Sequence, residues 1–170
     1  MRSVFEKTMG VWKTLRLVGL VAATAGWAGE AFGQKAADFP VESPHFAALK
    51  AAEPYLENED FELREEFWGG ELSGAKGKAI RLQFFAGNTY RVILAAPLVA
   101  MKVGGQLHVA LVDPSGRKIA RASSKKGEGA VVLKLNAKKS GLYMVLMSIE
   151  PPKGVAEEAS MPCVMYYGYE

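Results

Sequence analysis

The chain is poor in the residues that most often carry out catalysis or bind metals. Among its 170 residues there is one cysteine, Cys163, and there are two histidines, His45 and His108. A single thiol cannot close an intrachain disulfide, and two histidines without a third ligand at metal-binding spacing do not form a zinc motif. Cys163 lies in an apolar stretch with no identifiable histidine partner, which is typical of a buried strand residue and not of a nucleophile. We therefore predict no enzyme activity, no metal site and no cofactor.

Long hydrophobic runs are also missing. The apolar segment at residues 17–25 is too short for a bilayer-spanning helix, which needs about 20 residues. It follows a basic stretch and precedes a segment rich in small residues, with Ala31 and Gly33 placed for cleavage before Gln34. This arrangement predicts a secretory signal peptide over residues 1–33. We therefore expect a periplasmic or secreted protein with no stable membrane span; an uncleaved N-terminal anchor is the alternative.

Positive and negative charges are divided unevenly along the chain. Residues 34–71 contain three Lys or Arg and ten Asp or Glu, whereas residues 72–170 contain fourteen and six. The two parts are expected to attract each other in the folded protein. The cations of the second part are scattered through turns, which argues against nucleic acid as a partner. We predict that the signal peptide is followed by an acidic N-terminal arm at 34–66 and a β-sandwich domain at 67–170.

The acidic arm contains one helix signal and one cluster of carboxylates. Ser43 followed by Pro44 matches an N-cap and a first helical position, and Pro54 should end or kink the helix. Six carboxylates lie between residues 57 and 66. Calcium is one candidate ligand for them, but the run lacks the glycine of a calcium-binding loop. We interpret the cluster as a solvated face that docks on the basic domain.

Apolar and polar residues alternate in short segments from residue 78 to the end of the chain. Such alternation is typical of strands that bury one face, and the links between them carry turn signals such as Asp-Pro-Ser-Gly at 113–116. Seven or eight such strands predict an all-β fold, an antiparallel β-sandwich or jelly-roll with a short N-terminal helix. The predicted strands are 78–86, 89–95, 106–112, 117–122, 130–135, 142–149 and 163–169, with an edge strand near 61–63 as the eighth.

A Gly-Asn pair lies between two of these strands, in the segment FFAGNTYRVIL at residues 84–94. Glycine and asparagine tolerate the positive φ angles of tight reversals. We therefore predict that the strands on either side of Gly87 and Asn88 pair with each other as a β-hairpin. On this interpretation the turn serves strand return and does not bind a ligand.

Three segments in order resemble one family. They are LQFFAGNTYRVIL at 82–94, LVDPSGRKIA at 111–120 and NAKKSGLYMVLM at 136–147. Over residues 67–170 the chain is similar to the bacterial pre-peptidase C-terminal domain, through its Ala-Gly turn, its aspartate–glycine turn and its Ser-Gly-Leu-Tyr strand entry. The resemblance implies a small β-sandwich of the kind appended to secreted enzymes. The acidic opening segment and aspartate pair of that family are missing here, so no calcium or ligand role is carried over.

Aromatic side chains are the predicted ligand contacts. The candidates are Trp68, which is flanked by two glycines, and three tyrosines near the end of the chain, Tyr166, Tyr167 and Tyr169. Exposed aromatic residues of this kind serve binding surfaces. Because alternate residues of a strand point to opposite faces, Tyr166 is expected to face away from the other two tyrosines.

Catalytic motifs occur only out of context. Residues 123–126 match Ser-x-x-Lys but lie in a predicted polar loop and not on a helix, and the Gly-Lys at 77–78 lacks the following Ser or Thr of a phosphate-binding loop. Our first hypothesis is an exported, non-enzymatic binding or accessory module for a protein or cell-envelope component. A carbohydrate-binding module that uses the exposed aromatics is the alternative, and a hydrolase with a site at a sandwich edge is the weaker third hypothesis.

Overall fold

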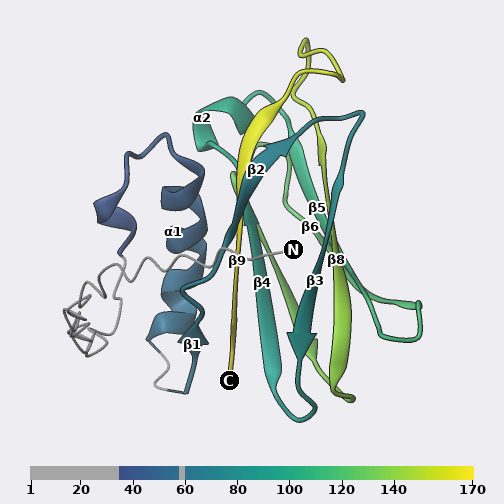
Figure 1. The fold of residues 1–170 in the computed structure, drawn as a ribbon. Helices are drawn as coiled ribbons and strands as arrows, with labels where there is room; N and C mark the ends of the chain where they lie inside the picture. The colour runs from purple at the N-terminus through teal and green to yellow at the C-terminus, as the bar shows by residue number, and fades with distance from the viewer. Residues whose placement is uncertain (1–34, 58–59) are drawn as a thin grey trace, which may run out of the picture. The chain divides into compact units, whose positions relative to one another are not determined.

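Nine strands in two antiparallel sheets dominate the structure (Figure 1). It is a computed structural model that describes residues 35–57 and 60–170; the predicted signal peptide lies outside the described residues. The described residues belong to one compact unit, Phe32–Glu170. The strands are β1 Glu62–Leu63, β2 Trp68–Leu72, β3 Lys78–Phe84, β4 Thr89–Ala95, β5 Gln106–Val112, β6 Lys118–Ser123, β7 Ala130–Asn136, β8 Gly141–Glu150 and β9 Met161–Tyr169. The helical elements are η1 Ala36–Asp38, α1 Pro44–Leu56 and α2 Leu98–Met101.

The two sheets pack face to face as a β-sandwich, so the predicted fold class is confirmed. Sheet A has the order β1-β9-β4-β7, with β2 pairing the same strand, β9, as β1 does; sheet B has the order β3-β8-β5-β6. Alternate residues of each strand point inward, and β5 shows this most regularly, with Leu107, Val109 and Leu111 buried between more exposed neighbours. The core between the sheets is apolar, and its fully buried members include Phe84, Val92, Leu94, Leu107, Leu111 and Val145.

The structure has one strand more than the seven or eight predicted. The additional strand is β2, whose sequence WGGEL pairs with β9 from Trp68 opposite Met165 to Leu72 opposite Met161. Two glycines interrupt its alternating pattern, and glycine is depleted in strands. Glycine is nevertheless required at Gly70, because a Cβ there would lie 2.6 Å from Cζ2 of Trp68. The indole thus lies over its own strand.

The acidic arm packs on the outer face of sheet A through helix α1. The helix begins as predicted, with the backbone N–H of Phe46 donating to Oγ of Ser43 at 3.1 Å. Pro54 lies inside the last turn, and the helix continues to Leu56. The buried residues Ala48 and Ala52 contact an apolar patch of β4 and β9. Where the charge distribution predicts electrostatic attraction, the contacts of Ala48 and Ala52 with the sheet are apolar.

A second contact of the arm surrounds Arg91 of β4. Its guanidinium lies 4.4 Å from the ring centroid of Tyr55 and 5.3 Å from that of Phe61. One of its nitrogens is 3.0 Å from a carboxylate oxygen of Glu170. The Arg91 side chain is only 10% exposed, so this cation is held between two aromatic rings and one carboxylate. The strand β1 follows directly and pairs with the end of β9.

The predicted β-hairpin at Gly87 is wrong. β3 pairs with β8 in sheet B, whereas β4 pairs with β7 and β9 in sheet A, so the turn carries the chain from one sheet to the other. Gly87 has the positive φ angle that the turn residue suggested, +95°. The N–H of Gly87 donates to the backbone carbonyl oxygen of Ala137 at 2.9 Å. Ala137 lies in the connection between β7 and β8, which also passes from one sheet to the other. Alternation identifies the buried face of a strand but not its neighbour, and a Gly-Asn turn serves either connection.

Candidate binding site

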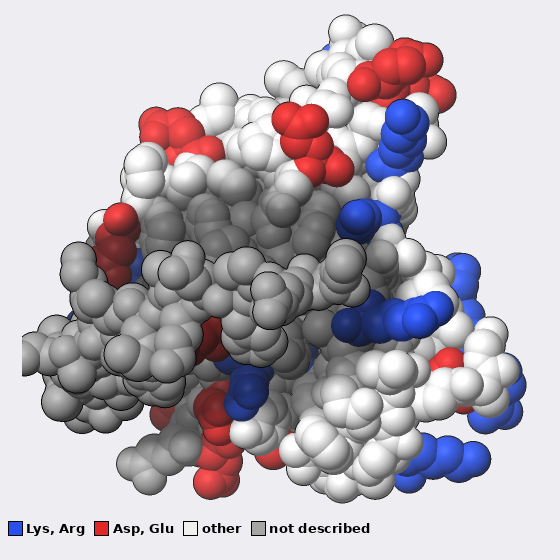
Figure 2. Space-filling model, viewed as in Figure 1, with Lys and Arg blue, Asp and Glu red and all other residues white. Residues whose placement is uncertain are grey.

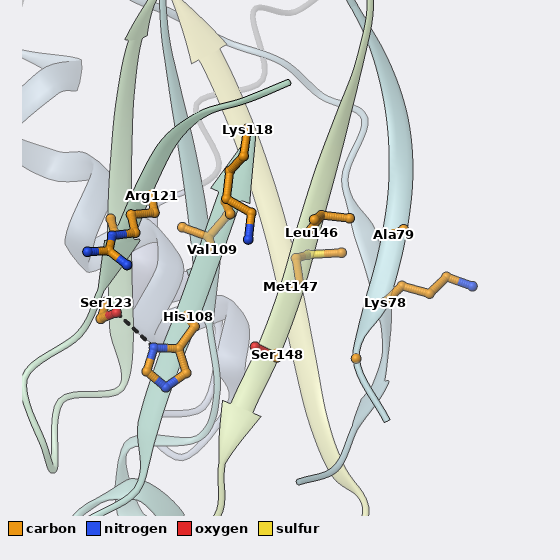
Figure 3. Close-up of a pocket in the computed structure, with 13 residues that line it drawn as sticks. Lys78, Ala79, His108, Val109, Lys118, Arg121, Ser123, Leu146, Met147 and Ser148 are labelled. Carbon is orange, nitrogen blue, oxygen red and sulfur yellow. Dashed lines mark hydrogen bonds between the residues drawn. The ribbon is translucent and has the colours of Figure 1, made fainter. Parts of the chain in front are cut away.

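Among residues 35–57 and 60–170, no helix packs on the outer face of sheet B, and a groove crosses this face (Figure 3). The groove has a volume of about 490 Å³. Its floor follows one row of the sheet, in which Ala79, Leu146 and Ala110 lie opposite one another in register. Two of these three side chains are short, whereas the long side chains of Lys118 and Arg121 lie beside them on β6. The difference in side-chain length produces the hollow.

Three cations and one histidine border this groove. Figure 3 shows Lys118 and Arg121 of β6 beside His108 of β5; Lys78 lies across the sheet on β3, and its side chain points away from these residues. Nδ1 of His108 lies 2.8 Å from Oγ of Ser123, which fixes the orientation of the imidazole ring. We call the surface formed by Lys78, His108, Lys118 and Arg121 the basic face.

The cations of the basic face have no acidic partner among the described residues. The ion pairs within residues 35–57 and 60–170 involve other side chains, and the three cations Lys78, Lys118 and Arg121 take part in none of them. All three are exposed. In Figure 2, which is viewed as in Figure 1, blue side chains gather on the side of sheet B, and red ones lie mainly on the side of α1 and at the top. The result is a local excess of positive charge.

A second hollow opens at the side of the sandwich where β3 is the edge of sheet B and the arm runs along β9. We call it the side slot; its volume is about 410 Å³. Its aromatic lining comes from Phe85, Tyr90, Tyr167 and Tyr169. The rings of Tyr90 and Tyr169 lie 5.8 Å apart, and the hydroxyl of Tyr169 donates to Glu62 at 2.7 Å. This hydrogen bond to a carboxylate raises the pKa of Tyr169, so its hydroxyl remains a donor.

The rim of the side slot carries polar groups of several kinds. On the side of the arm lie Arg64 and Glu66, and on the side of sheet B lie Arg81, Gln83 and Asn88. Arg64 is 3.1 Å from Glu62. The side chains of Glu66, Arg81 and Asn88 have no hydrogen-bond partner among the described residues. The rim therefore offers guanidinium donors, a carboxylate acceptor and amide groups that both donate and accept.

The four aromatic residues predicted as ligand contacts do not form one surface. Tyr167 and Tyr169 point to the inner side of β9 and line the side slot. Tyr166 points the opposite way, as predicted, and is only 2% exposed beneath the arm. Trp68 is partly buried against the core and lines neither hollow. The structure thus brings two of the four together and separates the other two.

Tyr166 contacts the second histidine of the chain. Nδ1 of His45 lies 2.8 Å from the hydroxyl of Tyr166. The imidazole stacks on Phe39 with ring centroids 4.8 Å apart and meets the edge of Phe67 at 5.0 Å. Burial lowers the pKa of His45 and raises that of Tyr166. The group connects the start of α1 to sheet A.

The burial of His45 gives the stability of the arm a dependence on pH. Because its folded-state pKa is below the ordinary 6.5, the neutral ring contributes stability fully above that value. This contribution falls as the pH drops below 6.5 towards the folded-state pKa. We expect the difference in unfolding free energy between wild type and His45→Gln to be smaller at about pH 5 than at about pH 7.5. Urea unfolding at both values measures it, and an equal difference would contradict the assignment.

The remaining candidates for chemistry are accounted for by packing. Cys163 is 1% exposed, and burial raises the pKa of its thiol to about 12, so the thiolate is not available at neutral pH. Within residues 35–57 and 60–170, no group of three or more His, Cys, Asp or Glu side chains is placed to hold a metal ion. Among the same residues, no helix has the length and apolar character needed to cross a bilayer.

No pattern in the sequence predicts the basic face. Residues 117–122, RKIARA, are predicted as a short polar strand. The sequence contains the cations of this strand but does not show that they face the same surface as residues of other strands. The side slot is predicted in part, because Tyr167 and Tyr169 are among the predicted ligand contacts. The arginines and amides of its rim come from three separate segments, which the sequence does not place together.

Comparisons with known proteins find only weak similarity to solved structures. No protein-family model matches the chain, and no curated protein matches it. The solved structures that resemble it include the Drosophila NLP core, described as giving insight into pentamer formation and histone binding, with 16% identity and a TM-score of 0.29 over 61% of this chain and 96% of that one. They also include the coconut allergen cocosin, with 13% identity and a TM-score of 0.22 over 58% of this chain and 25% of that one. At these TM-scores the likeness does not bear on function.

Proposed function

We propose that the chain is an exported, non-enzymatic β-sandwich that acts as a binding or accessory module, and that its partner is a protein with an acidic surface. The basic face is the docking surface. The observation that carries the proposal is the group of three exposed cations, Lys78, Lys118 and Arg121, which border a groove and have no acidic partner among the described residues.

The geometry supports a docking role for this face in two ways. The outer face of sheet A is occupied by helix α1, whereas no helix of the described part of the chain packs on the outer face of sheet B. A partly apolar floor with a charged rim is the usual composition of a protein interface. Unpaired cations at the rim increase the association rate with a partner of opposite charge.

The proposed binding role is consistent with the expected export of the protein and with its resemblance to an accessory domain. A module exported to the periplasm or secreted meets protein and envelope partners and no nucleic acid. The resemblance of residues 67–170 to the pre-peptidase C-terminal domain fits an accessory role of this kind. The absence of enzyme activity in the proposal is supported by the buried thiol of Cys163 and by the partners of both histidines.

Charge reversal on the basic face tests the proposal. The probe is a fluorescein-labelled peptide of alternating glutamate and leucine, with fluorescence anisotropy as the readout. We expect salt-dependent binding by the full chain and at least about tenfold weaker binding by Lys118→Glu/Arg121→Glu, since each removed charge pair contributes on the order of 1 kcal/mol.

The matched control reverses two cations on the side of α1, in Lys35→Glu/Lys50→Glu, which changes the net charge equally. This variant should bind the peptide with an affinity close to that of wild type. Equal weakening in both double variants would show that only net charge matters, and absence of peptide binding by wild type would also overturn the proposal.

A further inference from the structure

We propose that the side slot binds a neutral saccharide, independently of the basic face. The slot lies at the edge of the sandwich and not on the outer face of sheet B, and the two hollows share no lining residue. Its volume of about 410 Å³ falls within the range of small-ligand pockets.

The aromatic lining provides a surface for the apolar side of a sugar ring. Tyr167 and Tyr169 are both partly exposed, and Tyr90 lies behind them with 3% exposure. The position of the Tyr169 ring is fixed from two directions, by its hydrogen bond to Glu62 at 2.7 Å and by the Arg64 guanidinium 5.9 Å from the ring centroid. Rings that are held in place before binding lose little conformational entropy when the ligand arrives.

The rim matches hydroxyl groups, which both donate and accept hydrogen bonds. Arg81 supplies donors only, Glu66 supplies acceptors only, and Asn88 supplies both. Gln83 donates through Nε2 to the backbone carbonyl of Phe84 at 3.3 Å, which leaves its carbonyl oxygen as an acceptor. A polyhydroxylated ligand can satisfy such a mixed set, whereas a purely apolar ligand would leave it unpaired.

The charge balance of the rim distinguishes a neutral sugar from an anionic ligand. Arg64 is compensated by Glu62 at 3.1 Å, and Arg81 is accompanied by the carboxylate of Glu66 in the same lining. A phosphate or carboxylate ligand would therefore meet two carboxylates together with the two guanidinium groups. The slot thus differs from the basic face, where positive charge is in excess.

Isothermal titration of the full chain with cellohexaose, xylohexaose, laminarihexaose, chitohexaose and maltohexaose tests the inference, with polygalacturonate as the anionic probe. We expect one or more of the neutral oligosaccharides to bind with little dependence on salt. Arg81→Ala and Gln83→Ala should each weaken that binding roughly tenfold, since each removes hydrogen bonds to the ligand. Both residues are exposed on the edge strand β3, so the variants should fold.

The control Lys118→Ala lies on the basic face and should leave saccharide affinity unchanged, whereas Arg81→Ala should leave acidic-peptide binding unchanged. These two readouts separate failure of this inference from failure of the proposed function. Binding of none of the neutral oligosaccharides, binding of polygalacturonate alone, or full affinity in both slot variants would overturn the inference.

Discussion

Replacement of Phe84 by alanine is expected to lower the free energy of unfolding by about 3–5 kcal/mol, the usual cost of removing a buried aromatic ring. Phe84 is fully buried, and its ring stacks on that of Tyr90 with centroids 3.9 Å apart and an interplanar angle of 12°. Tyr143 of β8 packs against it at 5.2 Å. The substitution would leave a cavity between the sheets, because rings from both of them surround the site.

The neighbouring residue provides a control with the same chemistry. Phe85 is 57% exposed, and Phe85→Ala should change the free energy of unfolding by no more than about 0.5 kcal/mol. Its backbone N–H, which donates to the hydroxyl of Tyr90 at 2.9 Å, is retained in the variant. Urea unfolding of both variants gives the comparison. A similar loss for both would show that the inward position of Phe84 is assigned wrongly.

Arg91→Ala is expected to lower the free energy of unfolding by about 2–3 kcal/mol, because it removes the guanidinium that lies 3.0 Å from the largely buried carboxylate of Glu170. The two side chains are 10% and 21% exposed. The substitution also removes two cation–π contacts, with Tyr55 and Phe61, each contributing on the order of 0.5–1 kcal/mol. Because Tyr55 and Phe61 belong to the arm, limited proteolysis should cleave the arm faster in the variant.

Lys134 provides the control for Arg91, since its Nζ lies 3.9 Å from the same carboxylate of Glu170 but its side chain is 59% exposed. Lys134→Ala should cost no more than about 0.5 kcal/mol, as for other exposed ion pairs. Arg91→Lys should fall between wild type and Arg91→Ala, because it keeps the charge and loses the planar group that stacks on the rings. If Lys134→Ala proved as destabilising as Arg91→Ala, burial would not be the reason for the effect.

The elements of the fold could be predicted from the sequence because their signals are local. Strict alternation marked the strands, and Ser43 with Pro44 marked the start of α1. β2 was not predicted, because its two glycines interrupt the alternation of apolar and polar residues. The partners of the strands could not be predicted, since the choice between a hairpin and a crossing at Gly87 depends on contacts with the distant residue Ala137.

The candidate sites were less predictable than the fold for the same reason. Tyr167 and Tyr169 could be identified as partly exposed aromatics of one strand, and the opposite direction of Tyr166 followed from the strand period. The groove of the basic face depends on the sideways register of four strands, which sets short residues beside long ones. The sequence contains the cations but not this register.

The strand order has a consequence for how the chain reaches its folded state. β5 and β6 are consecutive in sequence and hydrogen-bonded to each other, whereas the other consecutive strands from β1 to β9 are not paired. Folding must therefore close long loops before most pairings can form, and sandwiches of this kind fold in milliseconds to seconds. β9 lies between β4 and the pair β1 and β2, so during synthesis β1 and β2 cannot join sheet A until β9 has emerged from the ribosome.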